Sequence, residues 1–402
     1  MKHILFFIIL VTLALTSYSQ EYYSYDKPIE KTIFSQILGD SVEIEITLPK
    51  SLKMGNGSEY PVIYLLDKQL IKNYEYNLQT IEYLTSLQNI PEAIIIGIPF
   101  TRKNRGAWTN PNATGGKADD FIAFIADELD SILKVNYPIS NFNMLIGHSR
   151  TAIFSSYALS SRYDFFNAVI ANSVSNFDFG DSLQQAQFEI FLDAIDTWST
   201  KYYYYFSVGE SYYGDLHEKY VDTLNTYLLN RDLPNTLQWR YYKYKTAHDI
   251  TPGLTVGRSL SDIFKEYGSK IDRCFEIAKD SAHKVPWNSY LNLYETISSD
   301  LGFSISFSDL FYNSLASTYY NNYNGEYGEN NLQFALEVLL KAIETYPNDY
   351  SYFMWIGEIY ITLNDYESGV SFLNRAVELI KADKTLSDTE RESLLMVVRS
   401  LY

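Results

Sequence analysis

One short stretch of the chain has the residue types and spacing of a catalytic nucleophile. Residues 141–160, "NFNMLIGHSRTAIFSSYALS", pass from an apolar run into a helical pattern through Gly147, Ser149 and Thr151. This spacing nearly matches Gly-x-Ser-x-Gly, in which a sharp strand-to-helix turn exposes a nucleophilic serine. Gly147 permits the sharp approach to the turn, whereas Thr151 stands where the pattern has its last glycine. Taken alone, this pattern is weak evidence that Ser149 is a nucleophile.

A serine nucleophile needs a base that takes its proton, and the order of the chain indicates which histidine that is. Where a Gly-x-Ser-x-Gly turn joins a strand to a helix, the acid and then the base follow the serine in the chain, each in a loop after a strand. His217 lies in a helical pattern and His283 lies in the helical C-terminal part, so neither has the required position. His248 follows the last strand-like run, in the loop "KTAHDITPG". We therefore predict His248 as the base.

Two carboxylates compete for the role of the acid. Glu210 directly follows Gly209 at the end of the run "YYYYFSVG", and Asp215 comes five residues later. Asp215 also suits the N-cap of the helix that follows. We favour Glu210 and keep Asp215 as the alternative.

The oxyanion of an acyl-transfer intermediate requires two backbone N–H groups. One is expected from Arg150, the residue after the nucleophile, and the other from Asp67 or Lys68 after the run "VIYLLD", of which we take Lys68. The Arg150 guanidinium could hold an anionic acyl or leaving group. The reading we prefer is that it points away and pairs with surface carboxylates. Trp108 could line the pocket or pack under a loop.

The elements that must position these residues alternate along the first two thirds of the chain. Between residues 29 and 250, short apolar runs alternate with helical patterns, which is typical of an α/β fold with flanking helices. The helical pattern at 119–135 places five apolar residues on one face. The expected strands are 41–49, 60–67, 92–100, 142–147, 167–173, 202–209 and 236–244.

After about residue 270 the strand signals stop, and the chain shows only helical patterns. Ala342 and Ala376 are equivalent positions of a repeat with the 34-residue period of tetratricopeptide repeats. Two such units are too few to fold alone, so we expect them to pack on the preceding domain. The predicted organisation is a signal peptide at 1–19, an α/β domain at 20–268 and a smaller all-α tetratricopeptide-like domain at 269–402.

Residues 29–268 resemble the esterase family that includes esterase D and the enterochelin-esterase-like α/β hydrolases. The resemblance rests on "YPVIYLLD", "IIIGIPFTRKNRGAWTNPN", "GGKADDFIAFIADELDSILKVNYPI", "LIGHSR" and the late histidine. It implies a serine hydrolase acting on carboxylic esters, with Ser149 as nucleophile, His248 as base and Glu210 as acid. The C-terminal helices are similar to repeat extensions that some members carry.

Two departures from this family lie close to the chemistry. Lys68 stands where members often have glycine, and Thr151 replaces the last glycine of the elbow. Folds routinely outlast their functions. The alternative hypothesis is therefore a catalytically decayed hydrolase that serves as a binding protein through its cleft and its helical repeats.

Composition narrows the location and the partners. The basic start, apolar run and small residues of 1–19 predict export to a periplasmic or extracellular space. A net charge of -17 disfavours nucleic acid as a partner. Neither metal-ligand spacing nor a dinucleotide motif is present, so no cofactor is expected. The expected partner is a small-molecule or glycan-linked ester, and the helical repeats could bind a protein.

Overall fold

The computed structural model describes residues 24–54, 58–174, 182–198, 200–210, 216–279, 287–321 and 329–402. The predicted signal peptide, the alternative acid Asp215 and His283 lie outside these ranges. Within them, no helix is both long enough and apolar enough to cross a membrane.

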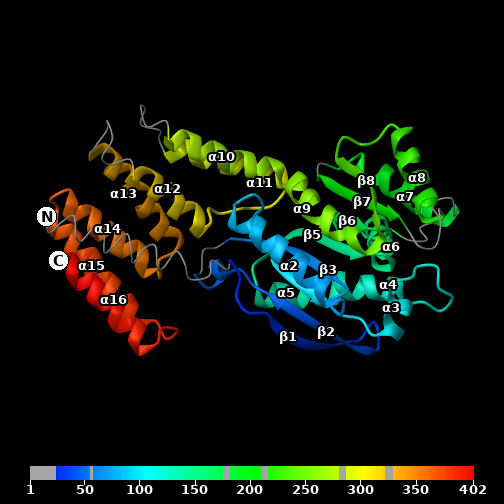
Figure 1. Ribbon diagram of the computed structural model, residues 1–402, viewed down its shortest axis with the longest axis horizontal. Helices are drawn as coiled ribbons and strands as arrows, with labels where there is room; N and C mark the ends of the chain where they lie inside the picture. The colour runs from blue at the N-terminus through cyan, green and yellow to red at the C-terminus, as the bar shows by residue number, and fades with distance from the viewer. Residues whose placement is uncertain are drawn as a thin grey trace.

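The N-terminal domain is built around an eight-stranded sheet with the order β1-β2-β4-β3-β5-β6-β7-β8 (Figure 1). β2 pairs antiparallel with β1 and β4, and the remaining neighbours pair in parallel. Every residue of β3 and β4 is buried, as expected for strands covered on both faces. The strands are β1 (Ile29–Ser35), β2 (Asp40–Thr47), β3 (Tyr60–Leu66), β4 (Ile94–Ile98), β5 (Ile139–His148), β6 (Ala168–Asn172), β7 (Tyr202–Glu210) and β8 (Leu237–Ala247).

The structure confirms the predicted α/β sheet and all seven strands expected from the sequence, and it adds one at the edge. β1 was not expected, because its residues alternate between exposed and partly buried positions and carry charges, so it shows no apolar run. An edge strand with one face to water has this pattern.

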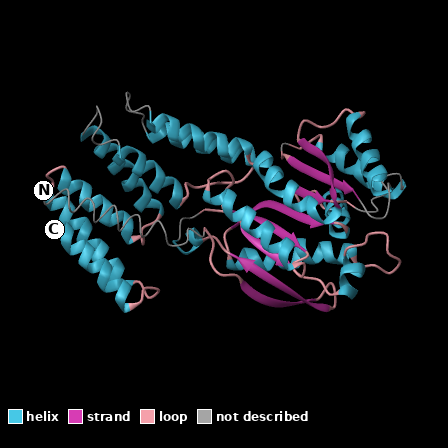
Figure 2. Cartoon of the chain, in the orientation of Figure 1, coloured by secondary structure: helices cyan, strands magenta, loops and turns pink. Residues whose placement is uncertain are grey.

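Helices cover both faces of the sheet (Figure 2). On one face, Phe121, Phe154 and Phe188 join a core with Tyr64 and Leu145 of the strands. On the other face, α2 and α9 contribute to a second core. The helices of this domain are α2 (Ile71–Ser86), α3 (Arg102–Trp108), α4 (Ala118–Ala123), α5 (Asp130–Asn136), α6 (Arg150–Ser161), α7 (Ser182–Ile195), α8 (Leu216–Leu229) and α9 (Thr251–Ile263).

The predicted helix at 119–135 is present with one irregular turn. A π-helical turn at Phe124–Leu129 joins α4 to α5. The five apolar residues predicted for one face are all fully buried: Phe121, Phe124, Ile125, Leu129 and Leu133. The helix therefore buries the face that its sequence pattern indicates.

The C-terminal part is all helical and packs on the sheet domain. Phe142 of β5 lies 5.7 Å from Phe264 and 5.4 Å from Phe303 between ring centroids. The second core thus continues from the sheet into the C-terminal helices, as expected. The predicted boundary at 268/269 falls inside α10. These helices are α10 (Lys265–Lys279), α11 (Trp287–Leu301), α12 (Asp309–Asn321), α13 (Glu329–Thr345), α14 (Tyr350–Thr362), α15 (Tyr366–Ala382) and α16 (Asp388–Leu401).

Close packing of α14 against α15 explains the small residues of the repeat. A Cβ atom added to Gly357 would lie 2.7 Å from Leu373 Cγ and 3.0 Å from the Gly369 carbonyl oxygen. Only glycine at these positions lets the two helices approach this closely. The helix pairs α12/α13 and α14/α15 have the arrangement that a two-helix repeat requires, and the tetratricopeptide assignment stays a prediction.

Candidate active site

Three neighbouring strands end in residues with left-handed backbone conformations. The residues are Asp67 (φ 65°), Ser149 (φ 59°) and Ser173 (φ 47°), which come directly after β3, β5 and β6. Non-glycine residues in this region cost free energy and cluster at functional sites. At the same edge of the sheet β7 ends with Glu210, and His248 follows β8. The fold therefore brings all the predicted catalytic residues to the carboxyl ends of the parallel strands.

Ser149 occupies a sharp turn between β5 and α6. Its backbone angles are φ 59° and ψ -115°. A Cβ atom on Gly147 would lie 2.3 Å from the Thr151 carbonyl oxygen, so the turn requires glycine there. Arg150 begins α6, where its N–H has no acceptor within the helix. This is the position required of an oxyanion donor next to a nucleophile.

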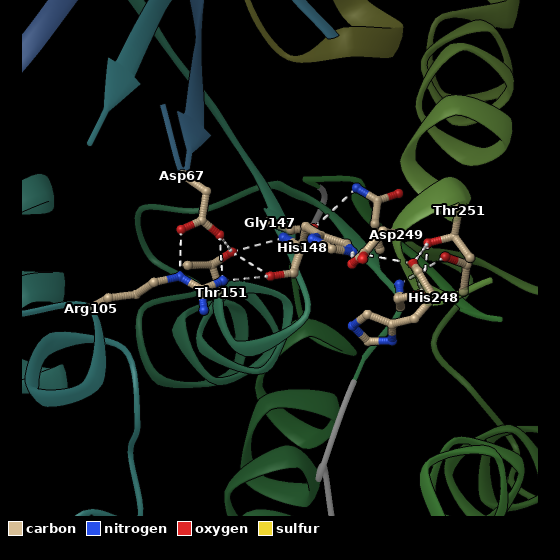
Figure 3. Close-up of polar contacts among 11 residues, drawn as sticks. Asp67, Arg105, Gly147, His148, Thr151, His248, Asp249 and Thr251 are labelled. Atoms are coloured by element: carbon tan, nitrogen blue, oxygen red, sulfur yellow. Dashed lines mark hydrogen bonds and ion pairs between the residues drawn. The ribbon is translucent and has the colours of Figure 1, made fainter. Parts of the chain in front are cut away.

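Thr151 is more than a tolerated replacement for glycine. Its side chain is fully buried, and its Oγ1 accepts a hydrogen bond of 2.8 Å from the His148 N–H. The same hydroxyl lies 2.7 Å from Asp67 Oδ2, to which it donates. A glycine could make neither contact. The hydroxyl therefore ties the turn that carries Ser149 to the loop after β3 (Figure 3).

An ion pair between Asp67 and Arg105 completes this network. Arg105 of α3 donates to Asp67 from Nε at 2.6 Å and from Nη2 at 2.8 Å, and Nη2 also lies 3.3 Å from the His148 carbonyl oxygen. The Asp67 side chain is only 2% exposed. Burying that carboxylate is tolerable because two charge-assisted hydrogen bonds offset its lost hydration. The pair thereby connects the loops that follow β3, β4 and β5. This ion pair was not predicted from the sequence, in which Asp67 and Arg105 are 38 residues apart.

Lys68 does not behave as predicted. Its backbone N–H donates to the Ile98 carbonyl oxygen at 3.2 Å, so this amide is already engaged and is not a free oxyanion donor. Its ammonium group turns toward the sheet edge, where it pairs with Glu45 at 2.7 Å and Glu30 at 3.2 Å. The left-handed residue of this loop is Asp67, so the position of Lys68 does not demand glycine. Lys68 is therefore withdrawn as the second oxyanion donor, and the alternative, the backbone N–H of Asp67, stays a prediction.

The loop that carries His248 is held against the nucleophile turn through its backbone. The His248 carbonyl oxygen accepts a hydrogen bond of 2.8 Å from Ser173 Oγ and lies 3.3 Å from His148 Nε2. Thr251 Oγ1 donates to Ser173 Oγ at 2.7 Å. The rings of His148 and His248 are 5.1 Å apart between centroids. The structure thus places His248 beside the residue that precedes Ser149.

The electrostatic surroundings keep His248 neutral. Burial, followed by the nearby His148, lowers the pKa of His248 from 6.5 to about 4. Burial also lowers the pKa of His148 and of His217, whose ring centroid lies 6.2 Å from that of His248. A neutral imidazole is the form that accepts a proton, so His248 is in the base form at pH 7.

Glu210, the favoured acid, lies at the end of β7. Glu210 is the exposed last residue of β7 and pairs in register with Ala247, directly before His248. Among the described residues, no hydrogen bond joins a carboxylate to the His248 ring. Asp215 lies outside the described ranges. Glu210 is therefore near the base in the sheet register, and its role as acid stays a prediction.

One group of side chains here could hold a cation. Ligand atoms of His148, His248 and Asp249 all lie within 4.8 Å of one another, the only such group in the part of the chain that the structure describes. His148 Nε2 already contacts the His248 carbonyl oxygen, and the Asp249 side chain is 88% exposed. The absence of a metal cofactor stays a prediction.

Trp108 belongs to the core and not to the site. Its side chain is buried, and its ring stacks on Phe121 with a centroid distance of 5.6 Å. Of the two readings that the sequence allowed, packing beneath a loop is the one observed.

Comparisons with known proteins agree with this fold. A family model described as "Putative esterase" matches residues 35–246, which is 212 of the 402 residues. An IroE-like serine hydrolase from Shewanella oneidensis is similar in structure, with 20% identity, a TM-score of 0.57 and coverage of 75% of this chain and 96% of that one. An uncharacterised protein from Capnocytophaga ochracea has 14% identity, a TM-score of 0.54 and coverage of 93% and 99%. No curated protein matches the sequence.

The Thr151 hydroxyl can be tested by two substitutions of similar size. Thr151→Val keeps the volume but removes the acceptor of the buried His148 N–H and a donor to Asp67, so we expect a loss of about 1–3 kcal/mol in the free energy of unfolding. Thr151→Ser keeps the hydroxyl and loses one methyl group, at about 1 kcal/mol. Urea denaturation measures both. A valine variant as stable as the wild type would show that the hydroxyl contributes nothing.

The depressed pKa of His248 predicts the pH dependence of ester hydrolysis. The base must be unprotonated, so activity is lost as the pH falls through its pKa. We expect kcat/KM for a neutral ester to hold its plateau through pH 6 and to be halved near pH 4, since the pKa of His248 is about 4. Circular dichroism at each pH distinguishes the loss of kcat/KM through protonation of His248 from a loss through acid unfolding. A midpoint near the ordinary histidine value of about 6.5 would contradict the expectation.

Proposed function

The chain belongs to this esterase family, and from that premise we propose that it hydrolyses carboxylic esters through an acyl-enzyme on Ser149. The observation that carries the proposal is the left-handed Ser149 between β5 and α6, with the loop of His248 hydrogen-bonded beside it. A strained serine at this position presents its hydroxyl at the edge of the sheet. The strain would serve no purpose in an ordinary turn.

In the proposed reaction, His248 takes the proton of the Ser149 hydroxyl as Oγ attacks the ester carbonyl carbon. The Arg150 N–H donates to the oxyanion of the tetrahedral intermediate. When the intermediate collapses, the protonated His248 gives its proton to the departing alcohol. Water then attacks the acyl group with His248 again as base, which releases the acid and restores Ser149.

The network around Asp67 supports this chemistry by holding the turn in place. Thr151 and Arg105 both bond to Asp67, and the His148 N–H bonds to Thr151. These contacts fix the residues before and after the turn, His148 and Thr151, so Ser149 and the Arg150 N–H keep their relative positions. Small displacements of a nucleophile cost large factors in rate, so a rigid turn favours catalysis.

Export is part of the same proposal. Residues 1–19 combine a basic start, an apolar run and small residues before Gln20, which is the pattern of a signal peptide. The single cysteine of the chain, Cys274, is buried and free, so the fold is independent of an oxidising compartment.

Covalent labelling tests the nucleophile. A fluorophosphonate should modify the wild-type protein once, on the peptide that contains Ser149, and mass spectrometry of the digest locates the adduct. Ser149→Ala should take no label and should lose turnover of 4-nitrophenyl esters by several powers of ten. An unlabelled Ser149 together with no ester turnover would favour the alternative of a decayed hydrolase that acts as a binding protein.

The two acid candidates can be separated by charge-neutral substitutions. Glu210→Gln should lower kcat by about 10⁴-fold, because the base loses the carboxylate that orients it, while Asp215→Asn should cost little. Both changes are nearly isosteric and remove one negative charge, so each serves as the control of the other. The reverse order of the two effects would assign the role to Asp215.

A further inference from the structure

The guanidinium group of Arg150 lies over the neighbouring helix α3. Arg150 is exposed on the first turn of α6, directly after Ser149. A Cβ atom on Gly106 would lie 3.1 Å from Arg150 Nη1, so the absence of a side chain at Gly106 makes room for this group. The preceding residue of α3, Arg105, contacts the His148 carbonyl oxygen. The Arg150 guanidinium therefore stays at the rim of the site.

Within the described ranges, no acidic side chain forms an ion pair with Arg150. The sequence suggested that it would pair with a surface carboxylate, yet among the described residues no carboxylate lies within ion-pair distance of it. The chain has a net charge of -17, and most of its arginines do find acidic partners. Those with ion pairs are Arg105, Arg162, Arg231, Arg240, Arg273, Arg375 and Arg391.

A second unpaired arginine shares this part of the surface. Arg102 is the first residue of α3 and is exposed, and no ion pair joins it to a described carboxylate. Arg102 and Gly106 are four residues apart, so they lie on the same face of the helix. Arg102 thus projects from the face over which Arg150 extends. Two like charges on one face repel each other, and an anion bound there would relieve that repulsion.

We propose that Arg150, assisted by Arg102, binds a negatively charged group of the ester, so that the substrates are anionic esters. This inference rests on the proposed function, since it names the substrate class of the same site. A guanidinium offers paired N–H donors that match a carboxylate. Because Arg150 adjoins the nucleophile, the anionic group lies a short distance from the scissile carbonyl, on its acyl or its alcohol side. No oxidant or second reactant besides water is needed.

Two matched pairs of esters test the charge preference. For the acyl side, mono(4-nitrophenyl) succinate is compared with 4-nitrophenyl pentanoate. For the alcohol side, 4-acetoxybenzoate is compared with 4-acetoxybenzamide. The readout is the ratio of kcat/KM for the anionic ester to that for its neutral partner, measured for the wild type, Arg150→Gln, Arg102→Gln and Arg399→Gln. Arg399 is the control, as it is an exposed arginine of α16 with no described ion pair.

We expect Arg150→Gln to lower the ratio for one of the two pairs by about tenfold or more, the effect of losing one charge-assisted contact. Arg102→Gln should lower it less, and Arg399→Gln should leave it unchanged, although all three remove one positive charge. Arg150→Lys should retain part of the preference, which guards against a folding defect in the glutamine variant. The preference should also weaken as salt is raised.

A ratio that is the same in the wild type, Arg150→Gln and Arg399→Gln, with neutral esters still hydrolysed, would overturn the inference and leave the proposed function intact. An equal fall in all three glutamine variants would indicate a general field effect and would also overturn it. No hydrolysis of any of the four esters, with no fluorophosphonate label on Ser149, would overturn both.

Discussion

The site depends on one strained residue, because Ser149 must adopt a left-handed backbone to stand between a strand and a helix. Such a conformation costs about 1–3 kcal/mol and persists only where the surroundings enforce it. Gly147 provides the space that the turn needs, and Thr151 bonds the turn to Asp67. Each buried hydrogen bond contributes about 1 kcal/mol. Together with the Arg105 ion pair, they offset the strain and hold the nucleophile in place.

The same turn also holds the loop that carries His248. His148 precedes Ser149, and its ring lies against the His248 carbonyl oxygen, which Ser173 also binds. Ser173 follows β6, so the base is attached to the sheet through the strand beside β5. The turn of Ser149 and the loop of His248 are thus connected by hydrogen bonds to the His248 carbonyl oxygen.

Much of this architecture could be predicted from the sequence, since strands buried on both faces produce apolar runs that are easy to recognise. The strand β1 could not, because it is an exposed edge with alternating residues. Ser149 and His248 could be selected as candidates from the order of residues along the chain. In the structure they follow β5 and β8 and lie at the carboxyl ends of the parallel strands.

What the sequence could not reveal depends on contacts between distant residues. Thr151 looked like a steric replacement for glycine, because its hydrogen-bond partner Asp67 is 84 residues away. The Lys68 N–H looked available, because its acceptor Ile98 belongs to a different strand. Likewise, whether a described carboxylate pairs with Arg150 can be recognised only once the positions of the surrounding residues are known.

Chemical trapping can show whether hydrolysis proceeds through an acyl-enzyme on Ser149. The protein is mixed with an excess of a 4-nitrophenyl ester, quenched in acid within the first turnovers, and digested for mass spectrometry. If Ser149 is the nucleophile, we expect a burst of about one equivalent of 4-nitrophenol and a single acyl group on the peptide that contains Ser149. Steady release of 4-nitrophenol with no burst, no acylated peptide and an unchanged rate in Ser149→Ala would contradict it.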